Sequence, residues 1–172
     1  MRRLSLALLV LTLAAVGGGC APGPAGPSAG TALPLFPMTL VFVGPREAGE
    51  PIGELRADGS IVTKHDGVVA RLLPDRIVGR DGRVKIVVSP GGEVWLDPKL
   101  PPMHFDAGDA LVSPKGEVIR VDDSGTPSWI APHGGLPPMD NVRFTPFSPA
   151  ARRTAEVLLI IIMEAAWSRG MT

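Results

Sequence analysis

The chain has 172 residues, and its 17 Lys and Arg residues balance 17 Asp and Glu residues, so the formal net charge is zero. This balance argues against a nucleic-acid partner, which would need a basic surface. The only cysteine is Cys20, which excludes an internal disulfide and a cysteine-rich zinc site. The length suits one domain with a hydrophobic core, but not two, once the N-terminal segment is set aside.

Residues 1–19 have the pattern of a secretory signal peptide. Arg2 and Arg3 precede an apolar run from Leu4 to Val16, and small residues at Gly17 to Gly19 then lead to Cys20. At about 1.5 Å per residue, the apolar run is too short for a helix to cross about 30 Å of hydrocarbon. We therefore expect cleavage of this segment and no permanent transmembrane anchor.

The place of Cys20, directly where cleavage is expected, resembles the acceptor cysteine of the bacterial prolipoprotein family. The family's cleavage box has a large aliphatic residue, two small residues and then the cysteine. Here Gly17 occupies the aliphatic position and Val16 lies one residue upstream. The resemblance implies that Cys20 carries a lipid, such as palmitate, that anchors the protein to a membrane. Plain secretion with an unmodified cysteine is the alternative.

Residues 20–34 are expected to form a flexible tether between this anchor and the folded part. The stretch from Ala21 to Ala32 consists almost wholly of Gly, Pro, Ala and Ser, which cannot bury enough apolar surface to become ordered. In lipoproteins of diderm bacteria, Asp after the cysteine marks retention in the inner membrane. By the same resemblance, Ala21 implies a place in the cell envelope at the outer membrane and not at the inner membrane.

Residues 35–147 carry the pattern of an antiparallel β-domain. Short runs rich in Val, Ile and Leu are separated by turn dipeptides, in which glycine accepts a positive φ at no steric cost. Turns this tight make successive strands antiparallel neighbours. We expect an antiparallel meander of repeated hairpins, as an open sheet or a small barrel-like sheet, with one C-terminal helix packed on it. The expected strands are 39–43, 52–56, 60–64, 68–72, 76–78, 83–88, 93–96, 110–112, 117–121 and 128–130.

Two of these hairpins look like copies of one unit. The stretch from Ser89 to Leu96 aligns with the stretch from Ser113 to Arg120, which places Gly92 and Gly116 at equivalent turn positions with positive φ. Ordinary hairpins that share the same turn residues are the alternative explanation.

Two proline-rich segments interrupt this meander. They run from Asp97 to His104 and from Ala131 to Pro138. Proline has no N–H group for a β-ladder, so both segments are expected to be equivalent loops.

Residues 148–170 are expected to form the C-terminal helix. Ser148 is a plausible N-cap, Pro149 suits the first helical position, and the chain from Ala150 to Trp167 contains no Gly or Pro before Gly170. The β-branched run at 160–162 leaves a strand as the alternative.

The expected helix is apolar on more sides than one sheet face can cover. Ile160, Met163 and Trp167 form a stripe that falls among the charged positions. The segment from Leu136 to Phe147 could fold over this stripe, with Phe144 and Phe147 as its cover. Otherwise the stripe is a contact site for a second copy or for another envelope protein. The main apolar face is expected at Ala151, Ala155, Leu158, Ile162 and Ala165, and the polar face at Arg152, Arg153, Glu156 and Glu164.

One motif resembles the active-site loop of aspartic proteases, the run Asp123-Ser124-Gly125-Thr126. In that family two such loops bring two carboxylates together to activate a water molecule. This chain has one copy, so the resemblance would require a dimer, and Asp122 stands where the family has a buried hydrophobic residue. The motif also falls at an expected hairpin turn, so Asp123 is only a weak catalytic candidate.

His104, Asp106, Asp109 and His133 are the candidates for a metal site. Imidazole and carboxylate groups from two loops could bind zinc or another divalent ion. Their spacing matches no specific metal signature, and isolated histidines in proline-rich loops are usually solvated.

The other familiar enzyme motifs are missing, including a nucleophile elbow, a phosphate loop and a dinucleotide fingerprint. We therefore expect no cofactor and a structural or protein-binding module of the envelope rather than an enzyme. Its partners would be the membrane, through the lipid, and another envelope protein or a second copy, through the C-terminal helix. The alternative is an envelope hydrolase or metal-binding protein that uses His104, Asp106 and their neighbours.

Overall fold

The structure is a computed structural model that describes residues 33–44, 48–131, 139 and 141–167, with side chains described as far as residue 165. Its strands form one 12-stranded antiparallel meander in which β1 to β11 follow chain order and β12 pairs with β1. The elements are β1 (Met38–Phe42), β2 (Pro51–Leu55), β3 (Ser60–Thr63), β4 (Gly67–Leu73), β5 (Arg76–Gly79), β6 (Val84–Val88), β7 (Glu93–Trp95), β8 (Met103–Phe105), β9 (Leu111–Val112), β10 (Val118–Val121), β11 (Pro127–Ile130), β12 (Val142–Thr145), the 3-10 helix η1 (Pro149–Ala151) and the helix α1 (Arg152–Trp167).

The predicted mainly β meander with one C-terminal helix is confirmed, with two corrections to the strands. The segment from Asp97 to His104 is not a loop throughout, because Met103 and His104 belong to β8, which pairs with β7 and β9. A proline blocks ladder bonds only at its own position, so the chain is free to pair after Pro102. The second correction is β12, a strand that the turn pattern did not indicate.

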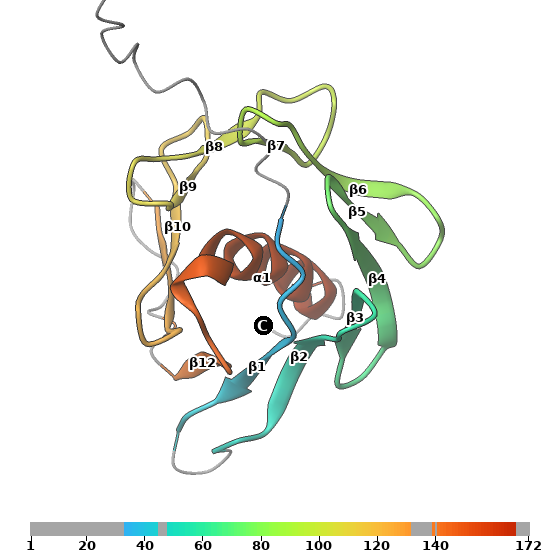
Figure 1. Ribbon diagram of the computed structural model, residues 1–172, viewed down its shortest axis with the longest axis vertical. Coiled ribbons are helices and arrows are strands. Elements are labelled where there is room, and N and C mark those ends of the chain that lie inside the picture. The colour runs from blue at the N-terminus through green and yellow to red at the C-terminus, as the bar shows by residue number, and fades with distance from the viewer. Residues whose placement is uncertain (1–32, 45–47, 132–138, 140, 168–172) are drawn as a thin grey trace, which may run out of the picture.

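The sheet curls into a nearly closed ring with α1 inside it (Figure 1). Its two edge strands, β11 and β12, approach each other, and the N–H of Phe144 donates to the carbonyl of Gly125 at 2.8 Å. A Cβ at Gly125 would lie 2.6 Å from the Phe144 carbonyl oxygen, so this close approach requires a glycine. The two edge strands therefore partly cover each other, because the ring brings β12 next to β11.

The position of α1 inside the ring makes it a core helix rather than an amphipathic surface helix. Residues 154–159 are all buried, including Glu156, whose exposed fraction is 0%. The expectation that Glu156 belongs to a polar face is therefore wrong. A helical wheel assumes that one face meets solvent, whereas here strands surround the first half of the helix. The chain ahead of β1 also packs on α1, because the Thr154 hydroxyl donates to the carbonyl of Pro34 at 2.9 Å.

The two turns that the sequence aligns have the same geometry. Gly92 and Gly116 have φ values of 83° and 80°, as predicted. In each turn the glycine N–H donates to a serine carbonyl at 2.9 Å, and the hydroxyl of the same serine accepts the N–H of the following glutamate at 3.1 Å. The serines are Ser89 and Ser113. The turns 56–59, 79–82, 106–109 and 122–125 close with the same backbone hydrogen bond and a positive φ at their last residue.

The aligned hairpins nevertheless turn opposite faces toward the helix. Val88 before the first turn is buried, whereas its counterpart Val112 before the second is half-buried. The reason is topological. In a meander, turns after even-numbered strands lie at one end of the ring and turns after odd-numbered strands lie at the other. The same type of turn is used at both ends, and the meander proceeds around the ring in one direction. At opposite ends, such a turn therefore directs equivalent side chains to opposite faces of the sheet.

This inversion extends to the other turns with the same backbone hydrogen bond. Where such a turn follows an even-numbered strand, the residue before it faces the core, as Leu55, Val88, Phe105 and Val121 do. The residue before the corresponding odd-strand turns is half-buried on the outer face, as Val78 and Val112 are. The ring therefore has two different ends, which we call the charged end (the even-strand turns) and the apolar end (the odd-strand turns).

Candidate functional site

The charged end ties two hairpin tips to the start of α1. Arg153 Nε donates to Asp109 Oδ1 at 2.7 Å, and the Arg153 guanidinium lies 4.9 Å from the centroid of the Phe105 ring. The neighbouring Arg152 pairs with Asp123 at the tip of the turn 122–125. These contacts fix the helix in the ring, and they engage both carboxylates.

Asp109 occupies the turn position that glycine holds in the equivalent turns. Its φ is 61°, the only positive φ at a non-glycine residue in the described part of the chain. Aspartate tolerates this conformation better than most residues but at some cost. The ion pair with Arg153 explains why a side chain is present here.

Asp106 and Asp122 are the first residues of their turns and act as turn caps. The Asp106 carboxylate accepts the N–H groups of Gly108 and Ala110 at 2.8 and 2.9 Å, and these bonds, that of Ala110 first, hold its pKa below the usual value. The pKa of Asp122 is also lowered: partial burial opposes the shift, but bonds from Ser124 and Thr126 outweigh it. Both carboxylates serve the local fold.

The metal and protease candidates are not assembled into a reactive centre by the described residues. His104 is exposed on β8, opposite Glu93, while Asp106 caps its turn and Asp109 pairs with α1. His133 lies outside the described residues. Within the described ranges, no three His, Cys, Asp or Glu side chains lie close enough to share a metal ion. The Asp123 motif forms a hairpin turn in which the Asp123 side chain is exposed and pairs with Arg152, while Gly125 is buried.

Glu156 is a buried carboxyl group that the sequence did not single out. Its Oε1 accepts the N–H of Val121 at 3.1 Å, and its Oε2 has no hydrogen-bond partner among the described residues. Burial raises its pKa to about 8, although the backbone N–H groups of Val121 and Leu111 and the charge of Arg152 act in the opposite direction. β10 continues to Val121 beyond the start of β9 at Leu111, so the Glu156 carboxyl group replaces a missing ladder partner there.

The apolar end contains inward-facing side chains that the helix does not cover. Val94 and Leu96 lie two residues apart and so point to one face, but Val94 is 0% exposed and Leu96 is 45% exposed. Val84 does not share this face, because a bulge in β6 pairs it with the outward-facing Val78, while Lys85 points inward toward the helix. The interior of the ring is thus packed in its middle and open toward this end.

These side chains line an open groove with two adjoining chambers, of about 350 Å³ and about 700 Å³. Leu96, Trp129 and Ile160 line both chambers, so the two form one continuous groove between α1 and the sheet. The smaller chamber is further lined by Val94, Leu100, Pro101, Met103, Ser113, Pro114, Lys115, Glu117 and Ile119, and the larger one by Val84, Lys85, Ile86, Met163 and Glu164. Their lining is mainly apolar, and the charged groups belong to the turn 113–116, its flank, β6 and the last turns of α1.

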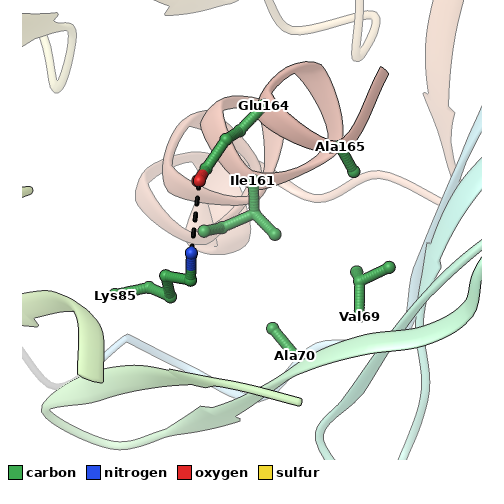
Figure 2. Close-up of a pocket in the computed structure, with 6 residues that line it drawn as sticks. All are labelled: Val69, Ala70, Lys85, Ile161, Glu164 and Ala165. Carbon is green, nitrogen blue, oxygen red and sulfur yellow. Dashed lines mark hydrogen bonds and ion pairs between the residues drawn. The ribbon is translucent and has the colours of Figure 1, made fainter. Parts of the chain in front are cut away.

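An ion pair bridges the sheet and the helix beside this groove. Lys85 Nζ lies 3.3 Å from Glu164 Oε1, and Figure 2 shows it reaching across from β6 toward the helix. Val69, Ala70, Ile161 and Ala165 complete a small cleft of about 160 Å³ around this pair. Both charged side chains are exposed, so this bridge is a weak tie by comparison with the packed half of the helix.

Two of the three residues expected to form an interaction stripe line this groove. Ile160 and Met163 are half-buried there, and the side chain of Trp167 lies outside the described residues. Phe144 and Phe147 do not line the groove. Phe144 is buried on β12, and Phe147 packs near Gly125. Sequence reasoning missed Val84, Leu96 and Leu100, although the exposed-looking Leu100 in a proline-rich segment was a signal.

Comparison with known proteins matched no family model, no curated protein and no solved structure. Within the described part of the chain, α1 is not long and apolar enough to cross a bilayer.

Proposed function

We propose that the protein is a lipoprotein of the bacterial envelope, anchored through a lipid on Cys20, whose ring is a binding module that takes an apolar group into its groove. The observation that carries the binding role is the exposure of inward-facing apolar side chains, Leu96 above all. Side chains that face the core of a ring normally pack against other protein atoms. An apolar groove of this size suits a ligand or a partner's side chains.

The anchor and tether support a position close to a membrane. The signal-like residues 1–19 and the Gly, Pro and Ala stretch end just before Leu33, which is buried and whose N–H donates to the carbonyl of Pro74 at 3.0 Å. Leu33, which directly follows the tether composition, is thus part of the packed domain. Binding is favoured over catalysis because Asp106, Asp109 and Asp123 are engaged in turns and ion pairs.

The anchor is tested by metabolic labelling with a fatty-acid analogue. We expect label on the wild-type chain and none on Cys20→Ser. Equal labelling of both would remove the anchor from the proposal.

The binding role is tested in cells with a photo-crosslinking amino acid placed at Leu96 or at Val87. The two positions have similar exposure, 45% and 42%, but Leu96 lines both chambers of the groove, whereas Val87 lies on the outer face of β6. We expect a discrete crosslinked product from position 96 that is missing from position 87. The same products from both positions, or none, would contradict binding in the groove.

A further inference from the structure

Resting on this proposed function, we propose that the groove binds one long fatty-acyl chain with an anionic head, as in a free long-chain fatty acid. The acyl chain would lie between α1 and β6 to β10, in contact with Leu96, Trp129 and Ile160. The head would remain at the mouth, near Lys115.

The lining chemistry selects an acyl chain over a peptide. A peptide carries an N–H and a carbonyl at nearly every residue, and each must find a partner when it leaves water. The inner lining, formed by Val94, Met103, Ile119 and Ile160, provides no polar side chain for this purpose. Ser113, the one hydroxyl residue of this chamber, already accepts the N–H groups of Lys115 and Glu117. An acyl chain has no polar group along its length and needs no such partners.

The shape of the groove favours a single flexible chain. Two chambers joined through Leu96, Trp129 and Ile160 form an elongated space alongside the helix. Leucine, isoleucine and methionine side chains fit flexible apolar groups by dispersion contacts, and methionine adapts readily to irregular shapes. The lining of the groove can thus adapt to its ligand. An unbranched chain would contact this lining along its whole length.

Charge at the mouth favours an anionic head. Lys115 lines the small chamber and forms no ion pair within the described ranges, whereas Lys85 pairs with Glu164 at 3.3 Å. Glu117 lies on the same wall, so the head must sit on the Lys115 side of the opening. A carboxylate there would gain a partner without entering the apolar interior.

The test uses the full chain carrying Cys20→Ser and a brominated octadecanoic acid as the probe, because bromine quenches tryptophan fluorescence on contact. We expect saturable quenching that is lost in Trp129→Phe, since Trp129 lines both chambers. Leu96→Glu should weaken probe binding at least tenfold, and Val87→Glu, on the outer face of β6, should not. Unfolding curves establish that each variant is folded, and Leu96→Gln replaces Leu96→Glu if the latter fails to fold.

The head is tested with Lys115→Gln. Loss of one exposed ion pair is expected to weaken binding of the brominated acid about two- to fivefold and leave its methyl ester unaffected. Equal weakening of acid and ester would overturn the assignment of the head to Lys115.

Failure of this inference differs from failure of the proposed function. Absent or unsaturable quenching overturns the acyl-chain assignment. If position 96 still crosslinks in cells while position 87 does not, the binding module stands with a different occupant. If both the quenching and the crosslink are missing, both proposals are wrong.

Discussion

The two ends of the ring hold the same helix by different physical means. At the charged end, Asp109 and Asp123 from two hairpin tips pair with successive arginines, and Glu156 is sealed beneath β10. At the apolar end, the Lys85 and Glu164 pair bridges the sheet and helix, and inward-facing side chains remain exposed. The difference shows that one end is built for closure, while the other keeps apolar surface accessible at a cost in stability.

The largest loss of stability should come from truncating a side chain on the buried face of α1. Leu158 is 1% exposed, so Leu158→Ala should lower the free energy of unfolding by about 2–5 kcal/mol through lost burial and a cavity. Ile160→Ala, two residues further on but in the open groove, should cost less than half as much. Urea unfolding curves of both variants measure the difference. Equal losses would mean that the groove side is packed like the rest of the core.

The next effect concerns the proton on Glu156. Its pKa is raised from 4.5 to about 8 in the folded chain, so between these values the unfolded chain releases a proton that the folded chain retains. The free energy of unfolding should therefore fall as the pH rises through this window, by up to about 1.4 kcal/mol per pH unit and a few kcal/mol in total. Below the window the group is neutral in both states and contributes no pH dependence.

Glu156→Gln isolates this contribution because glutamine has nearly the same shape and does not ionise. We expect the variant to be more stable than the wild type at alkaline pH. The difference between their free energies of unfolding should become smaller toward acidic pH. Unfolding measured at a series of pH values gives both profiles. Parallel profiles would show that Glu156 is not the group responsible.

Turn strain should be the same at both ends although their packing differs. Gly92→Val and Gly116→Val place a β-branched residue at φ values near 80°, which should cost on the order of 1–2 kcal/mol each. Gly91→Val is the matched control, because Gly91 is not among the positive-φ residues. A Cβ at Gly91 would lie 3.5 Å from the Ser89 hydroxyl oxygen, which is an ordinary contact distance. A loss at Gly91 as large as at Gly92 would point to crowding in place of backbone strain.

The smallest effect is expected at Asp109. Asp109→Gly removes an ion pair of about 0.2–1 kcal/mol and relieves the backbone strain at φ 61°, so the two changes nearly cancel. Asp109→Asn removes the charge and keeps the strained backbone, so it should be the less stable of the two. Thermal unfolding distinguishes them, and a reversed order would mean that the aspartate conformation carries no strain.

The sequence was sufficient for the meander, because glycine at a positive φ is a local requirement that leaves a local signal. Gly92 and Gly116 were identified from their neighbours alone, and the helix from its lack of breakers. The enclosure of that helix is not local. Whether Glu156 faces water or the inside of a ring depends on how far the sheet curls. The pattern of apolar residues in 148–170 gives no information about that curvature.

The site was harder to foresee than the fold for the same reason. Ile160 and Met163 stood out because they broke the helical pattern, but their partner Leu96 looked like an ordinary strand residue. Its role depends on which face of β7 turns inward, and that face alternates with the end of the ring at which each turn lies. The alignment of the two hairpins gave no sign that they turn opposite faces toward the helix.

The occupancy of the groove is tested most directly by thiol labelling of single-cysteine chains, with Cys20→Ser combined with either Leu96→Cys or Val87→Cys. Both thiols should react readily with a maleimide because both positions are exposed. We expect octadecanoic acid to slow labelling at position 96 at least several-fold and to leave position 87 unchanged. Unchanged labelling at position 96, or equal slowing at both positions, would contradict a groove that binds an acyl chain.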